Sequence, residues 1–125
     1  MLETIKKYPL VYLATPYSKS PAGLYDAFTI AAKITGRLLR DGIKVYSPIA
    51  HGHPISIHAN IDPYDHDIWM PFDEAMMDAA AAIVVVKLTG WDESKGIDHE
   101  IRYFKRAQKP VWFLDPETFE YNEVA

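Results

Sequence analysis

Four short apolar runs along the chain predict β-strands at residues 9–14, 43–48, 82–88 and 110–115. The third run, which contains Ala-Ile-Val-Val-Val, is the clearest, because a continuous apolar run is typical of a strand buried on both faces. The tail after residue 115 is expected either to add a short edge strand or to dock against the domain.

Three segments between these runs show the three- and four-residue spacing of helices with one buried face: residues 24–42, 67–81 and 96–108. In the second segment we expect Pro71 in the first turn, since a proline deeper in a helix removes a hydrogen bond. The regular helix is therefore predicted to begin near Trp69–Pro71.

The alternation of strands and helices predicts an α/β fold: a three-layer, doubly wound parallel sheet of four to five strands flanked by helices, of the flavodoxin or Rossmann type. The length of 125 residues fits a single domain, residues 1–125. In such sheets ligands bind outside the carboxyl ends of the strands. Residues 15–23, 49–66 and 89–96 leave these ends, so we expect the functional site among them.

Residues 49–66 show no clear period and contain two prolines and four of the five histidines. A loop this long in a small domain is usually functional. The histidines and nearby aspartates raise the question of a zinc site, but their spacing matches no standard ligand set. We therefore predict no metal, and we expect the histidines, His51 among them, to line a lid over the substrate.

Composition narrows the class of partner. The net charge is −4 and no run of Lys or Arg occurs, which disfavours a nucleic acid polymer and favours a small molecule. No apolar stretch approaches the ~18 residues that span a bilayer, and we expect no signal peptide and no membrane association. The absence of cysteine excludes disulfides and a thiol nucleophile, and it is consistent with a cytoplasmic location.

Glu100 is the first candidate for chemistry. It falls in the opening turns of a predicted helix, where the helix dipole favours the ionised carboxylate. Such a group at the mouth of the sheet is either a nucleophile or simply a helix-stabilising acid. Asp73, or the neighbouring Glu74, starts the preceding helix and is a candidate general acid.

Other candidates surround this pair. Ser94 and Gly96 at a helix start offer a phosphate cradle, although Ser94 is equally suited to be a helix cap. Tyr12, near the end of the first strand, is either a site residue or a core aromatic. Three aromatic side chains are expected either to form a wall for a flat base or to pack the domain: Tyr17, Trp69 and Trp91.

Three stretches, VYLATPYS, WMPFDEAMMDAAAAIVVV and SKGIDHE, carry a resemblance to a known family. In this order and at these separations they resemble the nucleoside 2-deoxyribosyltransferase-like superfamily. That superfamily includes nucleoside deoxyribosyltransferases and 2′-deoxynucleoside 5′-monophosphate N-glycosidases. The resemblance covers about residues 9–115 and is closest to a small bacterial branch.

The resemblance implies roles for the candidate residues. Glu100 would attack the anomeric carbon and form a glycosyl-enzyme, Asp73 would protonate or orient the base, and Tyr12 would hold Glu100 by a hydrogen bond. Water or a second base would then accept the sugar. The resemblance implies no metal or organic cofactor, and it implies a homo-oligomer, either a dimer or a tetramer.

Ser94 points to the kind of substrate. In the family, transferases acting on free nucleosides carry an acid at this position, whereas monophosphate hydrolases carry serine. A nucleotide is therefore favoured, with further contacts from Gly96, Thr15, Tyr17, Ser18, Trp69 and His51. Arg102 stands where the family has a small residue, and it is expected to narrow the pocket or to serve a different ligand.

Two other functions remain open on the sequence. The first is a non-catalytic nucleotide-binding sensor of the same fold, which would bind without releasing base. The second is a metal-dependent phosphoesterase that uses the His and Asp residues of the 49–66 segment.

Overall fold

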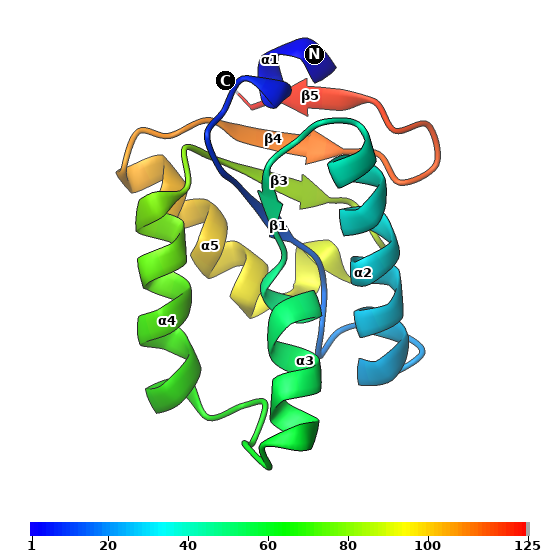
Figure 1. Ribbon diagram of the computed structural model, residues 1–125, viewed down its shortest axis with the longest axis vertical. Helices are drawn as coiled ribbons and strands as arrows, with labels where there is room; N and C mark the ends of the chain where they lie inside the picture. The colour runs from blue at the N-terminus through cyan, green and yellow to red at the C-terminus, as the bar shows by residue number, and fades with distance from the viewer. Residues whose placement is uncertain (125) are drawn as a thin grey trace.

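A five-stranded sheet forms the centre of the molecule (Figure 1). The computed structural model describes residues 1–124. The strand order is β2-β1-β3-β4-β5, the doubly wound order of flavodoxin-like sheets, and β5 is antiparallel to its neighbour whereas the others are parallel. The strands are β1 (Val11–Ala14), β2 (Val45–Tyr46), β3 (Ala82–Val86), β4 (Val111–Leu114) and β5 (Tyr121–Glu123). The α/β prediction is confirmed, and the tail adds an edge strand.

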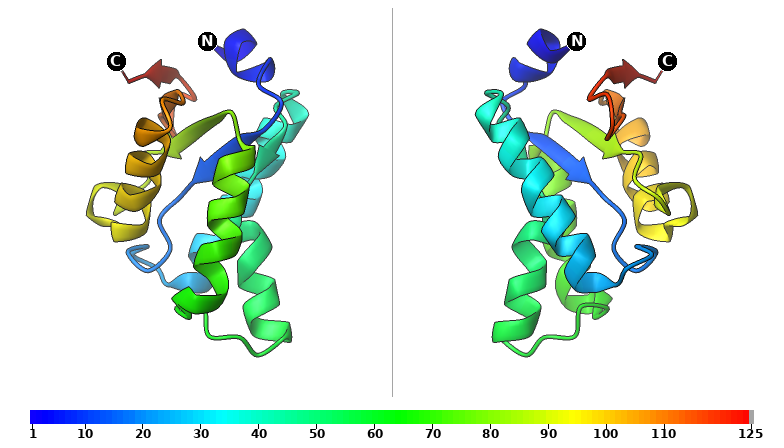
Figure 2. Two further views of the ribbon diagram at one scale, coloured as in Figure 1. Left: turned by 90° about the vertical axis from the view of Figure 1, so that its left-hand side faces the viewer. Right: turned by 90° about the vertical axis from the view of Figure 1, so that its right-hand side faces the viewer.

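Helices cover both faces of this sheet (Figure 2). They are α1 (Leu2–Lys6), α2 (Leu24–Arg40), α3 (Pro48–His58), α4 (His66–Ala79) and α5 (Lys95–Arg106), with a 3₁₀ turn, η1, at Trp91–Glu93. Helices α1 and α2 pack on one face, and α4 and α5 pack on the other. None of the helices within residues 1–124 combines the length and the apolar character needed to cross a membrane.

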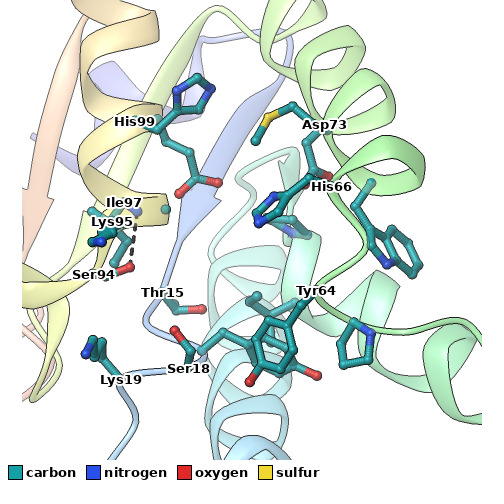
Figure 3. Close-up of a pocket in the computed structure, with 18 of the residues that line it drawn as sticks. Thr15, Ser18, Lys19, Tyr64, His66, Asp73, Ser94, Lys95, Ile97 and His99 are labelled. Atoms are coloured by element: carbon teal, nitrogen blue, oxygen red, sulfur yellow. Dashed lines mark hydrogen bonds between the residues drawn. The ribbon is translucent and has the colours of Figure 1, made fainter.

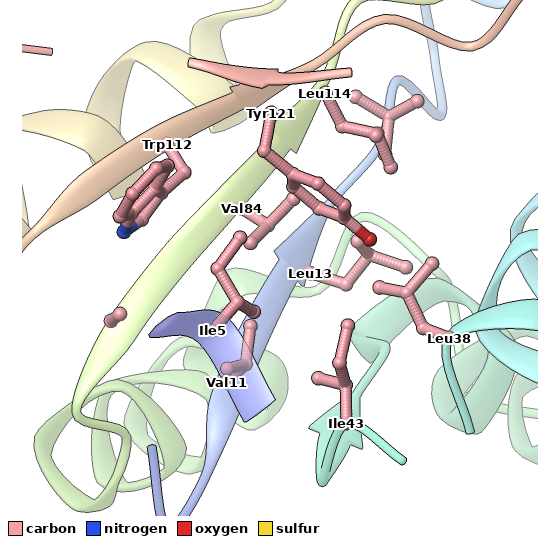
Figure 4. Close-up of a cluster of buried hydrophobic side chains, with 11 residues drawn as sticks. Ile5, Val11, Leu13, Leu38, Ile43, Val84, Trp112, Leu114 and Tyr121 are labelled. Carbon is pink, nitrogen blue, oxygen red and sulfur yellow. The ribbon is translucent and has the colours of Figure 1, made fainter. Parts of the chain in front are cut away.

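Alternation along the strands divides the core between the two faces. Val11 and Leu13 of β1 join the cluster under α1 and α2, which also contains Leu38 of α2 (Figure 4). Tyr12 and Ala14 point to the opposite face, toward α4 and α5. The two-sided burial explains why the strands read as continuous apolar runs.

The predicted loop at residues 49–66 is wrong in its first half, because residues 48–58 form helix α3. Ser47 caps this helix by accepting a hydrogen bond from the amide of Ala50, and Pro48 occupies the first turn. Pro54 lies inside the helix, which is where a proline normally predicts an end. The helix shows no amphipathic period because it packs against α2 on one side and lines the candidate cavity on another.

The predicted start of the next helix is also wrong. Helix α4 begins at His66, and Asp65 caps it by accepting a hydrogen bond from the amide of Asp67 at 3.2 Å. Pro71 therefore lies in the second turn. Its missing N–H leaves only the carbonyl of Asp67 without a helical donor, and Asp67 is exposed to water.

Candidate active site

A cavity of about 460 Å³ opens outside the carboxyl ends of β1 and β3. The chain crosses from one side of β1 to the other at this point, which is where doubly wound sheets bind ligands. The walls come from the β1–α2 loop, α3, α4 and the first turns of α5 (Figure 3). The volume is in the range of small-molecule sites.

A hydrogen bond joins Tyr12 and Glu100 at the base of this cavity. The fully buried Tyr12 hydroxyl donates to Oε2 of Glu100 at 2.5 Å, and Glu100 reaches the cavity from the second turn of α5. Burial, together with the charges of Glu100 and Asp73, raises the pKa of Tyr12 far above its usual value. The Tyr12 phenol therefore keeps its proton and remains a donor at every physiological pH. Because it donates to Oε2, the other oxygen of Glu100, Oε1, takes no part in this hydrogen bond.

Asp73 supplies a second carboxylate to the same cavity, from the start of the third turn of α4 (Figure 3). Burial raises the pKa of Asp73 to about 6. Burial also raises the pKa of Glu100, to about 8, with the Tyr12 hydrogen bond acting to lower it and the charge of Asp73 to raise it. Two such carboxyls titrate as a pair, which holds one proton between about pH 6 and pH 8.

Of the two adjacent candidates for the general acid, Asp73 and Glu74, only Asp73 lies in the cavity. Asp73 lines the cavity, whereas Glu74 lies 3.9 Å from Nε2 of His99, through its Oε2. His99 and His66 both line the cavity as well. His66 was expected only as one of the histidines of a lid, and His99 was not among the predicted site residues. His66 was placed in a loop, and no helical register was available to place it beside Asp73.

Ser94, labelled in Figure 3, lies at the start of α5 and lines the cavity, as does Gly96. The Ser94 hydroxyl caps the helix by accepting a hydrogen bond from the amide of Ile97 at 3.2 Å. The capping role and a ligand role are compatible, since an accepting hydroxyl still has its own proton to donate. Lys95 and, from the β1–α2 loop, Lys19 bring positive charge to the same end of the cavity.

Gly90 holds two of the cavity loops in close approach. Its φ of +95° lies in the region that favours glycine, and a Cβ there would stand 2.3 Å from the carbonyl oxygen of Lys19. The β3–α5 loop and the β1–α2 loop can therefore meet only through a residue without a side chain. This contact fixes Lys19 and the adjoining Ser18 at the mouth of the cavity.

The remaining predicted contacts from the first loop also line the cavity. Thr15 is 5% exposed, and its hydroxyl has no hydrogen-bond partner within residues 1–124. The Tyr17 hydroxyl lies 2.6 Å from Nδ1 of the buried His53, which fixes the orientation of the tyrosine ring. The Trp69 indole donates to the carbonyl of Asp62 at 3.0 Å and presents its ring to the cavity.

Three residues singled out by the sequence do not line this cavity. The ring of His51 stacks on Phe72, Trp91 packs against Phe113, and Arg102 is exposed and pairs with Asp98 at 3.0 Å. The expectation that Arg102 narrows the pocket is therefore wrong. Across residues 1–124 no three His, Asp or Glu side chains are grouped as a metal site would require.

The fold and the cavity together define an α/β domain with a two-carboxylate site at the switch point of its sheet. The chain belongs to the family described as Domain of unknown function (DUF1937), whose model matches residues 9–115. A comparison with curated proteins finds no match. The resemblance to the nucleoside 2-deoxyribosyltransferase-like superfamily therefore stays a prediction, and the geometry of the site carries the functional argument.

Proposed function

We propose that the protein cleaves or transfers the N-glycosidic bond of a nucleotide through a covalent glycosyl intermediate on Glu100. The observation that carries this proposal is the pairing of Glu100, held by Tyr12, with a second carboxyl, Asp73, in one cavity. Two carboxyls of which one is ionised and one protonated are what such a displacement needs.

In the first step, Oε1 of Glu100 attacks the anomeric carbon of the sugar while Oε2 stays hydrogen-bonded to Tyr12. The bond from this carbon to the base nitrogen breaks, and its electron pair stays with the base. Asp73 donates its proton to the base as it leaves. The products are a free base, an ionised Asp73 and a sugar joined to Glu100 by an ester bond.

In the second step, Asp73 takes a proton from a water molecule or from a second base. The activated water or base nitrogen attacks the anomeric carbon, and Glu100 leaves as a carboxylate. Tyr12 supports both steps in the same way, because a hydrogen bond to the ionised form favours the charge on Glu100. That bond lowers the pKa of Glu100, but burial keeps it above the pKa of Asp73. The reactive form is therefore the minor singly protonated state, in which Asp73, not Glu100, carries the proton.

The opposite end of the cavity favours a phosphate on the substrate. Ser94 and the amides at the start of α5 face this space, and Lys19 and Lys95 supply charge. A helix start with free amides and a hydroxyl stabilises an anion. These groups support a nucleoside 5′-monophosphate over a free nucleoside.

The proposal is tested by base release. The purified protein is incubated with deoxy- and ribonucleosides and their 5′-monophosphates, with and without a chelator, and free base is separated by chromatography. We expect base from at least one monophosphate, equally with and without chelator, and none from the Glu100→Gln variant. Binding of a monophosphate without base release, even with a second base present, would instead favour the sensor function.

A further inference from the structure

A second, partly buried tyrosine lies directly beside Tyr12 in the sheet. Tyr46 of β2 is the register partner of Tyr12 on β1, and their ring centroids are 5.9 Å apart. The two side chains therefore point to the same face of the sheet, toward α4 and α5. Tyr12 donates to Glu100, but in the described part of the chain the Tyr46 hydroxyl is buried without any partner.

An unpartnered buried hydroxyl lowers stability. Among such groups, Tyr46 is distinguished by its position beside Tyr12 and near both carboxyls of the site. The packing around Tyr46 indicates where that partner lies. Its ring meets Phe72 of α4 in a T-shaped contact at 6.2 Å, and Phe72 directly precedes Asp73. Burial, and then the charges of Asp73 and Glu100, raise the pKa of Tyr46, which places both carboxyls within electrostatic reach of the phenol.

Asp73 is the carboxyl that lacks a donor. Glu100 already accepts from Tyr12, whereas burial alone accounts for the raised pKa of Asp73, with no hydrogen bond from residues 1–124 to lower it. An unpartnered donor on β2 and an unpartnered acceptor on α4 thus lie on the same face of the sheet, on either side of the contact between Tyr46 and Phe72. A hydrogen bond from the Tyr46 hydroxyl to Asp73 becomes most favourable when Asp73 is an anion.

We propose that Tyr46 is a positioning residue that donates a hydrogen bond to Asp73 when this carboxyl is ionised. The catalytic part of this inference rests on the proposed function. In that reaction Asp73 loses its proton to the departing base, and Tyr46 stabilises the charge that forms. Each carboxyl then has its own tyrosine: Tyr12 for the nucleophile and Tyr46 for the acid.

Other titratable groups share the wall with Asp73, so the test must isolate the phenol from them. They come from β1, the β1–α2 loop, the α3–α4 connection, α4 and α5, and comprise Tyr12, Lys19, Tyr17, Tyr64, His66, Lys95, His99 and Glu100. On the side of Tyr46, the ring of His51 from α3 lies 5.7 Å from the phenol ring. The variant Tyr46→Phe removes one hydroxyl and leaves all of these in place. A hydrogen bond to the ionised form lowers a carboxyl pKa, so its removal must raise the pKa of Asp73.

Tyr121→Phe is a matched control. Tyr121 is also a buried tyrosine whose hydroxyl has no partner within residues 1–124, but it lies on β5 in the cluster under α1 and α2. Both variants delete a buried, unpartnered hydroxyl, and we expect both to fold at least as stably as the unaltered chain. Only Tyr46 lies on the face of the sheet that is covered by α4, the helix of Asp73.

The test is a ¹³C NMR titration of the Asp73 carboxyl, assigned with Asp73→Asn and recorded without substrate. We expect Tyr46→Phe to move the titration midpoint to higher pH by about 0.5 to 1, and Tyr121→Phe to leave it unchanged. In the unaltered chain the Cζ signal of Tyr46, but not that of Tyr121, is expected to follow the Asp73 titration. An unmoved midpoint, or an equal movement in both variants, would overturn the proposal.

Measurements of kcat and KM test separately the part of the proposal that concerns catalysis. With a substrate found by base release, Tyr46→Phe is expected to lower kcat about tenfold with little change in KM, since the bond forms as charge develops. A Tyr46→Phe variant with unchanged kcat would contradict this part. Failure of the unaltered protein to release any base would refute the proposed function, whereas the NMR midpoint decides the hydrogen bond in either case.

Discussion

Glu100 is subject to opposing influences that set the protonation of the candidate site. Burial disfavours its charge, whereas the short hydrogen bond from Tyr12 favours it. A surface glutamate at the same helical position would have neither influence. The sequence supports the choice of Glu100 only through its position and the resemblance, because the burial and the tyrosine come from segments far apart in the chain.

A first prediction concerns the stability cost of this carboxyl. The pKa of Glu100 is raised from 4.5 to about 8 in the folded chain, so the folded state binds more protons than the unfolded state between these values. The free energy of unfolding must therefore fall as pH rises through this window. Glu100→Gln removes this loss, and we expect it to be more stable than the unaltered protein at pH 8 by roughly 2–4 kcal/mol.

Denaturant titrations at about pH 5 and pH 8 measure this difference. Glu117→Gln, which changes an exposed carboxylate, is the control and is expected to leave the pH dependence unchanged. An equal gain for Glu100→Gln at both pH values would show that Glu100 is not a buried acid.

A second prediction separates the two roles of Ser94. Ser94→Asp keeps a side-chain oxygen for the amide of Ile97, so it should retain the cap, whereas Ser94→Ala should lose about 1 kcal/mol of stability. The added carboxylate repels a phosphate, so Ser94→Asp should weaken binding of a monophosphate and spare the matching nucleoside. Calorimetric titration with both ligands measures this. Equal weakening of both would count against a phosphate at this end of the cavity.

At the level of elements, the site depends on loops that the sheet brings together. The prediction of the strands succeeds because burial on both faces gives continuous apolar runs, and that of α2 and α5 succeeds because their apolar periods reflect one buried face. Helix α3 is missed because a helix with protein contacts on two sides and Pro54 inside it has no such period. His99, and the place of His66 in the first turn of α4, are missed for a related reason, since the approach of both to the cavity depends on where α4 begins and how α5 is rotated.

A third prediction concerns the contact between the two cavity loops. Gly90→Ala introduces a Cβ that collides with the Lys19 carbonyl, so the loops must separate. Gly23→Ala is the control, because Gly23 has the same φ of +95° but nothing within 4 Å of an added Cβ. Both variants should lose about 1–3 kcal/mol from backbone strain. Only Gly90→Ala should also lower kcat/KM, by about 100-fold, through misplacement of the loop. Similar kcat/KM values for both would exclude a role for the loop contact.

At the level of the whole molecule, the sheet delivers Tyr12, α4 delivers Asp73 and α5 delivers Glu100 to one point. The doubly wound order is predictable from the alternation of elements, and so is the edge at which the loops meet. The pairing of the two carboxyls is not predictable from the sequence, because the distance between them depends on how α4 and α5 pack on the same face of the sheet. The pairing nevertheless determines how the activity depends on pH.

A fourth prediction is a bell-shaped dependence of kcat/KM on pH with its maximum near pH 7. Below about pH 6 both carboxyls are protonated and Glu100 cannot attack, and above about pH 8 both are ionised and Asp73 has no proton to donate. The profile should be recorded with a nucleoside if one is accepted, since a phosphate itself titrates at about 6. In Asp73→Asn the remaining activity should lose the bell shape. A profile that is flat between pH 5 and pH 9 in the unaltered protein would contradict the shared proton.

The most direct test of the central claim is to trap the sugar on Glu100. The protein is incubated with an accepted nucleotide or its 2′-fluoro analogue, which slows release of the glycosyl group, then quenched in acid and digested for mass spectrometry. We predict that the peptide containing Glu100 gains the mass of the sugar phosphate, and that Glu100→Gln shows no such gain. Base release without an adduct on Glu100, at the same rate in Glu100→Gln, would show that Glu100 is not the nucleophile.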